Sequence, residues 1–151
     1  LEKVNLNLAC EPLKLHINSY GGSAYDMMSL IDVIETSNVP IEAHVHYAMS
    51  AALAIASACH YRIGYKRSRF MFHGVSTGDF GKLQDMRENM VESNFLEDTY
   101  VEILCENTNM KREKLKQIVK EKKDWYFDSK LALKMAVIDE IFGEEVEETQ
   151  N

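Results

Sequence analysis

The chain has 151 residues and a net charge of −7, a length that favours one domain. Its 46% hydrophobic and 27% charged residues are ordinary for a globular protein. The negative charge argues against a nucleic-acid partner, because phosphate binding needs a basic face. No stretch of the sequence reaches the roughly 20 apolar residues of a membrane span, so we expect no membrane segment either.

The three cysteines, Cys10, Cys59 and Cys105, are odd in number and have no paired spacing. This pattern favours reduced thiols and a cytoplasmic location. No basic region followed by an apolar run opens the chain, so the sequence predicts no signal peptide. The chain begins at Leu1 rather than Met, and we expect that an upstream part is missing or processed. We expect one domain over residues 1–143 and an acidic tail without fixed structure over residues 144–151.

Strands and helices alternate in the first half of the chain. Period-two hydrophobicity predicts the strands, and apolar residues three and four positions apart predict the first helix. The second helix is apolar all round, which predicts that it is buried. The predicted strands cover residues 13–18, 41–47, 61–64 and 69–72, and the predicted helices cover 23–37 and 50–59. This alternation predicts an α/β fold with parallel strands.

The second half of the chain is predicted to be mostly helical. A glycine-punctuated extended segment over residues 74–81 precedes a long helix over 82–106 and a charged helix over 111–122. Asp128 or Ser129 is expected to cap a last helix that ends at Met135. A final strand is expected to begin at Val137.

Ser50 lies between a predicted strand and the buried helix, and small residues, Ala51 and Ala52, follow it. A helix N-terminus gathers free N–H groups and the positive end of the helix dipole. Both features suit a nucleophilic serine, because acyl transfer needs N–H donors for the oxyanion. The simpler interpretation is that Ser50 caps the helix, and local geometry alone favours that interpretation.

Of the five histidines, His73 is the best candidate for a general base. It ends a predicted strand and enters the glycine-rich segment, and sites in α/β folds gather at strand ends. His44 and His46 share one face of a strand, but no cysteine or carboxylate cluster at ligand spacing joins them, so we expect no metal site. His60 ends a helix, and His16 lies in a strand.

Asp124 is the best candidate for the acid that orients the histidine. It precedes the aromatic residues 125–127, and a carboxylate buried among them would need a partner such as a histidine N–H. Asp128 competes with it, but a helix cap explains Asp128. Gly21 and Gly22 follow the first predicted strand, where unobstructed backbone N–H groups can face a ligand.

In their order and spacing, these segments resemble the proteolytic subunit of the Clp protease, the ClpP family, from about Leu13 to Ile141. The matching segments are INSYGG at 17–22, AMSA at 48–51, RFMFH at 69–73, KDWY at 123–126 and AVID at 136–139. The resemblance implies a repeated β-β-α spiral core, which crotonases share, and a protruding helix-plus-strand handle. It also reverses the preference for Ser50 as a mere cap.

The resemblance implies a serine endopeptidase. Ser50 would be the nucleophile, His73 the base and Asp124 the orienting acid. The backbone N–H groups of Gly22 and Ala51 would bind the oxyanion.

The same resemblance implies a substrate and an assembly. An extended peptide would pair with Val75, Ser76, Thr77 and Gly78. The family forms two stacked heptameric rings, a tetradecamer, around a chamber, and a hexameric AAA+ unfoldase feeds it with unfolded protein. ATP is used only by that partner, so no cofactor is expected.

The chain departs from the family pattern at several positions. Tyr20 replaces a proline before the two glycines, Ala52 and Ala136 stand where glycine is common, and Val75 lies near a usual proline. The family also has a further helix, strands and axial loops before the first motif, where this chain has about sixteen residues. Two alternatives follow: a crotonase-like acyl-CoA enzyme, and a non-catalytic ClpP-like scaffold subunit.

Overall fold

The structure is a computed structural model that describes residues 6–7, 9–76 and 82–144. Its strands are β1 (Leu13–Ser19), β2 (Ile41–Met49), β3 (Tyr61–Phe72), β4 (Trp125–Asp128) and β5 (Glu140–Ile141). Its helices are α1 (Ala24–Glu35), α2 (Ala51–Ala58), α3 (Leu83–Asn107), α4 (Arg112–Lys120) and α5 (Ser129–Lys134). None of the helices within these ranges is both long and apolar enough to cross a bilayer.

The sheet has the order β1-β2-β3-β4, and β5 pairs with β3 beside this path. Strands β1, β2 and β3 pair in parallel, which confirms the predicted α/β class. Because α1 and α2 connect these parallel strands, the carboxyl ends of β2 and β3 meet at one edge of the sheet. Helix α2 is buried, as its apolar sequence predicted, with Leu53 and Ala54 fully inaccessible to solvent.

Strand β3 contains both of the short strands predicted for this region. Residues 61–64 pair with β2, the register then shifts, and pairing resumes at Arg69. Ser68 stabilises the bent backbone at this register shift. Its Oγ accepts from the Tyr65 N–H at 2.7 Å and donates to the Val45 carbonyl at 2.6 Å. The bend divides the strand between two partners, β5 at its start and β4 at its end.

Strand β4 was not predicted, and it pairs antiparallel with the end of β3. Its Phe127 is buried and stacks on Phe70 with ring centroids 5.4 Å apart. Four residues are too few for a periodic signal, so packing against β3 decides their conformation.

The final strand does not begin at Val137, and the prediction was wrong there. Ala136 has φ = 53°, and the N–H groups of Ala136 and Val137 donate to the carbonyls of Leu133 and Ala132 at 3.0 and 2.8 Å. These two bonds close the end of α5 as a Schellman motif. The strand therefore starts only at Glu140.

Arg62 in β3 links three other parts of the fold: Asp139 before β5, the end of α2 and the end of α3. Its Nε and Nη2 donate to the two carboxylate oxygens of Asp139 at 2.9 and 2.7 Å. Its Nη1 donates to the carbonyls of Ser57, near the end of α2, and Asn107, at the end of α3. The guanidinium thus satisfies carbonyls that two helix ends leave without helical partners.

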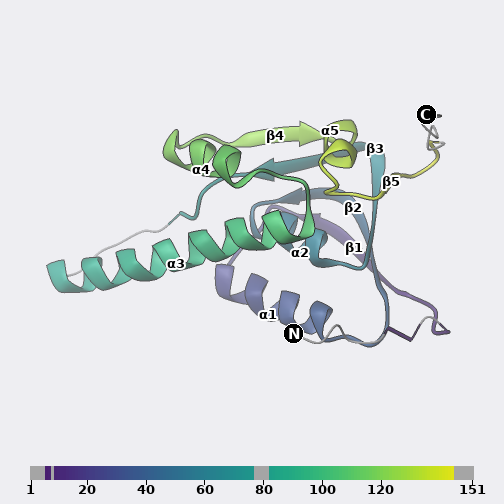
Figure 1. Cartoon of the computed structure of the whole chain (residues 1–151), viewed down its shortest axis with the longest axis horizontal. Helices are drawn as coiled ribbons and strands as arrows, with labels where there is room; N and C mark the ends of the chain where they lie inside the picture. The colour runs from purple at the N-terminus through teal and green to yellow at the C-terminus, as the bar shows by residue number, and fades with distance from the viewer. Residues whose placement is uncertain (1–5, 8, 77–81, 145–151) are drawn as a thin grey trace.

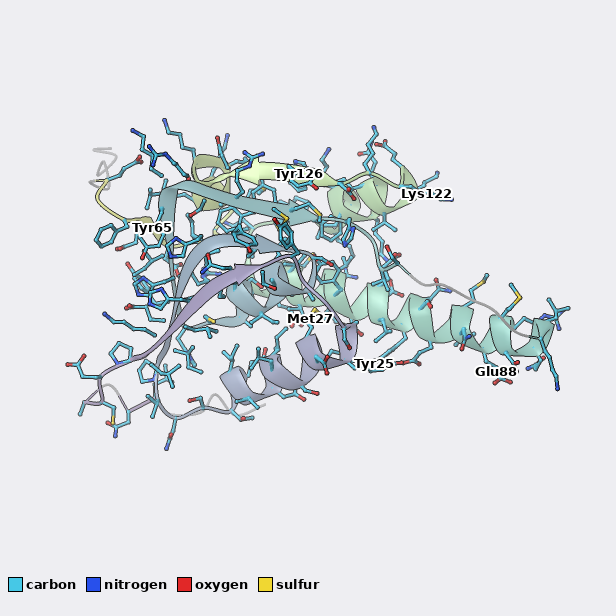
Figure 2. The ribbon with its side chains drawn as sticks, turned by 180° about the vertical axis from the view of Figure 1, so that it is seen from behind. Tyr25, Met27, Tyr65, Glu88, Lys122 and Tyr126 are labelled. Atoms are coloured by element: carbon cyan, nitrogen blue, oxygen red, sulfur yellow. The ribbon has the colours of Figure 1, made fainter. Side chains whose placement is uncertain are left out.

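Helix α3 extends well beyond the rest of the molecule at its N-terminal end (Figure 1). Its second half carries the buried Leu96, Tyr100, Val101 and Leu104. In its first half the side chains stand clear of the body, as Glu88 does in Figure 2. The apolar residues of this helix therefore fall into a buried set in its second half and an exposed set in its first half.

Candidate active site

Ser50 occupies a strained turn between β2 and α2. Its backbone has φ = 55° and ψ = −126°, a region of backbone angles that residues other than glycine rarely adopt. Its N–H donates to the Met71 carbonyl at 2.9 Å, which fixes the turn to β3. Its side chain makes no capping hydrogen bond to α2, so the helix-cap interpretation does not account for the hydroxyl.

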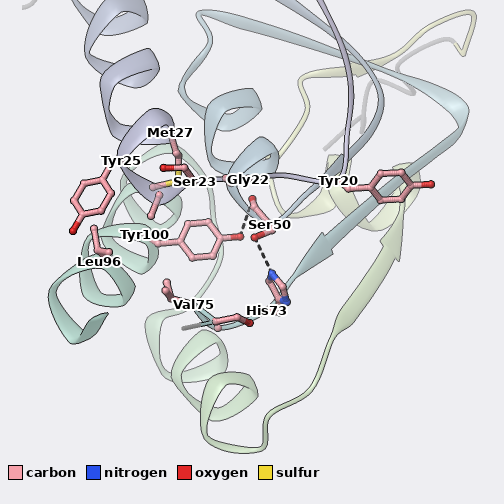
Figure 3. A pocket seen from close by; sticks show the side chains of 14 residues that line it. Tyr20, Gly22, Ser23, Tyr25, Met27, Ser50, His73, Val75, Leu96 and Tyr100 are labelled. Atoms are coloured by element: carbon pink, nitrogen blue, oxygen red, sulfur yellow. Dashed lines mark hydrogen bonds between the residues drawn. The ribbon is translucent and has the colours of Figure 1, made fainter. Parts of the chain in front are cut away.

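The Ser50 hydroxyl instead contacts His73. The Ser50 Oγ lies 2.8 Å from the His73 Nε2, the dashed contact in Figure 3. His73 follows the last residue of β3, and Ser50 follows the last residue of β2. Because these strands are parallel neighbours, both residues emerge at the same edge of the sheet. A hydroxyl at this distance can transfer its proton to an unprotonated imidazole nitrogen.

Asp124 lies on the other side of the His73 ring. Its Oδ1 is 3.4 Å from the His73 Nδ1, longer than an ordinary N–H···O hydrogen bond. The Asp124 side chain is 55% exposed, so the expectation that aromatic residues bury it was wrong. Asp124 precedes β4, whose pairing with β3 brings the carboxylate near His73 but leaves it in solvent.

Asp128, the competing acid, is accounted for by a local role. Its Oδ1 accepts from the Leu131 N–H at 2.9 Å at the start of α5. The predicted helix cap is therefore confirmed, and Asp128 has its own structural function.

The glycine turn packs directly against the Ser50 turn. Gly21 has φ = 103°, and its N–H donates to the Ser19 Oγ at 3.1 Å. A methyl group on Gly21 would lie 2.7 Å from the Met49 carbonyl oxygen and 3.1 Å from the Ala51 nitrogen. The two turns thus touch through their backbones, and Gly21 makes that approach feasible.

Gly22 and Ala51 lie beside the Ser50 side chain. Both residues line one pocket together with Ser50 and His73. Ala51 is the first residue of α2, so its N–H has no partner within the helix. Nothing lies within 4 Å of a methyl group placed on Gly22, so the space beside this glycine is open to a ligand.

The pocket has a volume of about 450 Å³. One wall comes from α1 and α3, where Tyr25, Met27, Leu96 and Tyr100 supply apolar surface (Figure 3). Val75 and Ser76, two of the four residues expected to pair with substrate, also line the pocket. The other two, Thr77 and Gly78, lie outside the described residues.

The hydroxyl groups of two tyrosines in this pocket make contacts that the sequence does not reveal. The Tyr100 hydroxyl donates to the Ser50 carbonyl at 3.0 Å, and burial raises the pKa of Tyr100 well above its usual value. The Tyr25 hydroxyl donates to the Glu92 Oε1 at 2.8 Å, and this bond raises the pKa of Tyr25. Tyr100 lies in the predicted long helix, and its partner is fifty residues away in the chain, so no local pattern points to this contact.

The remaining histidines form no metal site in the part of the chain that the structure describes. The His16 and His44 rings stack with centroids 4.8 Å apart, and His46 stacks on Tyr65 at 4.5 Å. The two ring nitrogens of His44 contact the Tyr65 hydroxyl and the Glu42 carboxylate. His60 accepts the Ile41 N–H through its Nδ1, which is a structural contact.

Comparison with known proteins identifies related sequences. The family model described as Clp protease matches residues 4–145. A protein of Deinococcus radiodurans named ATP-dependent Clp protease proteolytic subunit is 26% identical over 137 residues, which are 89% of this chain and 66% of the relative. ATP-dependent Clp protease proteolytic subunit 1 of Prochlorococcus marinus is 28% identical over 134 residues, with 85% and 66% covered. The chain thus spans 66% of the length of either relative.

Proposed function

Because the chain belongs to the Clp protease family, we propose that it is a serine endopeptidase in which Ser50, His73 and Asp124 form the catalytic triad. The observation that carries the proposal is the 2.8 Å contact between the Ser50 Oγ and the His73 Nε2. The strained backbone of Ser50 at the N-terminus of α2 adds support, since nucleophilic serines sit on such strand-to-helix turns.

The reaction would proceed by acyl transfer. The Ser50 Oγ attacks the peptide carbonyl carbon while its proton moves to the His73 Nε2. The resulting oxyanion accepts hydrogen bonds from the N–H groups of Gly22 and Ala51. His73 then gives the proton to the leaving amine, the C–N bond breaks, and water repeats the cycle on the acyl-enzyme.

Asp124 would orient His73 and stabilise the imidazolium that forms. With 3.4 Å between the Asp124 Oδ1 and the His73 Nδ1, the carboxylate needs only a small side-chain movement to accept a hydrogen bond. Its 55% exposed side chain remains hydrated, so its stabilisation of the imidazolium is weaker than that of a buried carboxylate.

The substrate would be an extended, unfolded polypeptide. Its backbone would pair with the segment from Val75 to Gly78, in the manner of an added strand. The apolar wall of the pocket would take an apolar side chain next to the scissile bond, because Met27 and Leu96 offer no charge.

The protein would act as an assembly of two stacked heptameric rings. The protruding half of α3 carries five exposed apolar side chains, and exposed apolar patches mark protein–protein interaction sites. They are Leu83, Met86, Met90, Val91 and Phe95, each at least 41% exposed. We propose that this surface packs on another copy, and that a partner AAA+ unfoldase supplies both ATP use and substrate.

We test the assembly with Met90→Glu, because Met90 is 64% exposed and the change is harmless in a monomer. Light scattering should then report smaller particles, and circular dichroism should report an unchanged helix content. Glu88→Gln, on the same protruding segment, should leave the particle mass as it was. Equal masses for all three proteins would contradict a role for this surface in assembly.

The three free thiols support a cytoplasmic location as part of the same proposal.

The test of the chemistry is labelling with a fluorophosphonate followed by intact mass measurement. One adduct is expected on the wild type and none on Ser50→Ala, while Ser76→Ala, which changes another pocket serine, should label like the wild type. An assembled wild type that takes no label would contradict the peptidase and favour the scaffold alternative. A thermal shift with acyl-CoA in that unlabelled protein would favour the crotonase-like alternative.

A further inference from the structure

Tyr100 is joined to the Ser50 turn from a distant part of the chain. Helix α3 presents its hydroxyl to the Ser50 carbonyl oxygen at 3.0 Å, the second dashed contact at Ser50 in Figure 3. The same oxygen accepts the Leu53 N–H at 2.9 Å. Both lone pairs of this carbonyl are therefore occupied, one by the first turn of α2 and one by Tyr100.

The Tyr100 side chain is held rigidly enough to position its partner. Its ring stacks on Phe72 with centroids 5.3 Å apart, and the residue is only 3% exposed. A buried phenol without a hydrogen-bond partner would be costly, and the Ser50 carbonyl satisfies it. Two contacts therefore hold the Tyr100 side chain in place: the stack of its ring on Phe72 and the hydrogen bond from its hydroxyl to the Ser50 carbonyl.

The Ser50 carbonyl and the Ala51 N–H belong to one peptide unit. A trans peptide is planar, so its C=O and N–H point in opposite directions and rotate together. Holding the carbonyl toward Tyr100 therefore turns the Ala51 N–H away from it. The Ala51 nitrogen does lie against the glycine turn, 3.1 Å from where a methyl on Gly21 would stand, and Gly22 lines the same pocket as Ala51.

We propose that Tyr100 is a positioning residue that orients the Ser50–Ala51 peptide, so that the Ala51 N–H is aimed at the oxyanion of the reacting carbonyl. This inference rests on the proposed peptidase function. A hydrogen bond to a peptide carbonyl also polarises the N–H of the same peptide, which makes it a stronger donor. Tyr100 touches no reacting atom and acts only through this peptide.

The test compares the wild type with Tyr100→Phe, which removes the hydroxyl and keeps the ring that stacks on Phe72. We expect kcat for a peptide substrate to fall by about tenfold with KM within about twofold, because loss of a whole oxyanion donor costs about 10²–10³ and here the donor remains but is less well aimed. The affinity of a peptide aldehyde, whose Ser50 adduct carries the oxyanion, should fall by the same factor.

The matched control is Tyr61→Phe, which removes a tyrosine hydroxyl that donates to Glu140 and does not line the pocket. It should leave kcat and the aldehyde affinity within about twofold, so a general effect of losing a tyrosine hydroxyl is separated from the effect at Ser50. Tyr100→Met, which fills similar space without a hydroxyl, should repeat the loss if Tyr100→Phe does not assemble.

The two proposals fail in different ways. If wild type takes a fluorophosphonate label and hydrolyses peptide, but Tyr100→Phe has an unchanged kcat and aldehyde affinity, the role of Tyr100 is overturned and the peptidase stands. A change in KM alone would also overturn it, since that would make Tyr100 a substrate contact. If assembled wild type takes no label, the peptidase is overturned, and the role of Tyr100 falls with it.

Discussion

Gly21→Ala and Gly22→Ala form a matched pair that tests how the glycine turn supports Ser50. Gly21 has φ = 103°, where an alanine costs about 1–2 kcal/mol. Its new methyl would lie 2.7 Å from the Met49 oxygen and 2.9 Å from the Ser50 Cβ, and relieving such overpacking against backbone costs about 1–3 kcal/mol. The two terms together predict a loss of about 2–5 kcal/mol of unfolding free energy for Gly21→Ala.

The assay is thermal unfolding at equal protein concentration, together with the rate of fluorophosphonate labelling. A loss of this size lowers Tm by roughly 4–20 °C in a chain of this length. The clash also pushes Ser50 from its place, and a displacement of about 1 Å slows labelling by about 10²-fold. Gly22→Ala should leave Tm nearly unchanged, because nothing lies within 4 Å of its methyl.

The comparison between the two variants decides the matter. If Gly21→Ala unfolds at the wild-type temperature and labels at the wild-type rate, the contact between the glycine turn and the Ser50 turn is not as the structure has it. Equal destabilisation by both variants would equally refute the reasoning, since it would point to a general cost of removing glycine.

Three further predictions concern the site and its support. His73→Ala should slow fluorophosphonate labelling by about 10⁴-fold, whereas Asp124→Asn should slow it by only about 10²-fold, because Asp124 is exposed and 3.4 Å from His73; equal losses would contradict this loose arrangement. Arg62→Met should lower the unfolding free energy by about 3 kcal/mol, since Asp139 loses its ion-pair partner and the carbonyls of Ser57 and Asn107 lose a donor. Lys123→Met, which breaks an exposed pair with Glu121, should leave Tm unchanged, and the same Tm for both variants would refute the role of Arg62. Burial raises the pKa of Cys59 to about 12, so almost no thiolate forms at about pH 8. When alkylation by iodoacetamide is mapped by peptide mass, the exposed Cys10 should be alkylated and the buried Cys59 should stay protected until denaturant is added. Rapid alkylation of Cys59 in the folded protein would contradict its burial.

Local patterns were sufficient for most of the fold. The apolar periodicity of α1 and the all-round apolar sequence of α2 identified these helices, because burial of one face or of all faces imposes a repeat on the sequence. Both stretches of β3 were predicted, and the structure joins them through the bend that Ser68 holds. The parallel order followed from the alternation of strands and helices.

Strand β4 and the start of β5 were not predictable in the same way. Strand β4 is four residues long and exists because Phe127 packs on Phe70. The last strand begins later than predicted, because Ala136 adopts a left-handed conformation that extends the end of α5. A four-residue strand is too short to show a periodic pattern. The end of α5 is closed by local bonds to Leu133 and Ala132, but alanine stands at the position where glycine usually marks such an end.

Some features of the candidate site were predictable from the sequence, and others depend on tertiary packing. Ser50 and His73 were singled out because each follows a strand, and parallel neighbouring strands end at one edge; this much is encoded in the order of residues along the chain. The hydration of Asp124, the backbone contact of Gly21 with the Ser50 turn and the bond from Tyr100 to the Ser50 carbonyl arise only when β3, β4 and α3 are packed together. Amino-acid order specifies which groups stand at the ends of elements, whereas the distances between those groups, on which proton transfer and oxyanion binding depend, are set by tertiary packing.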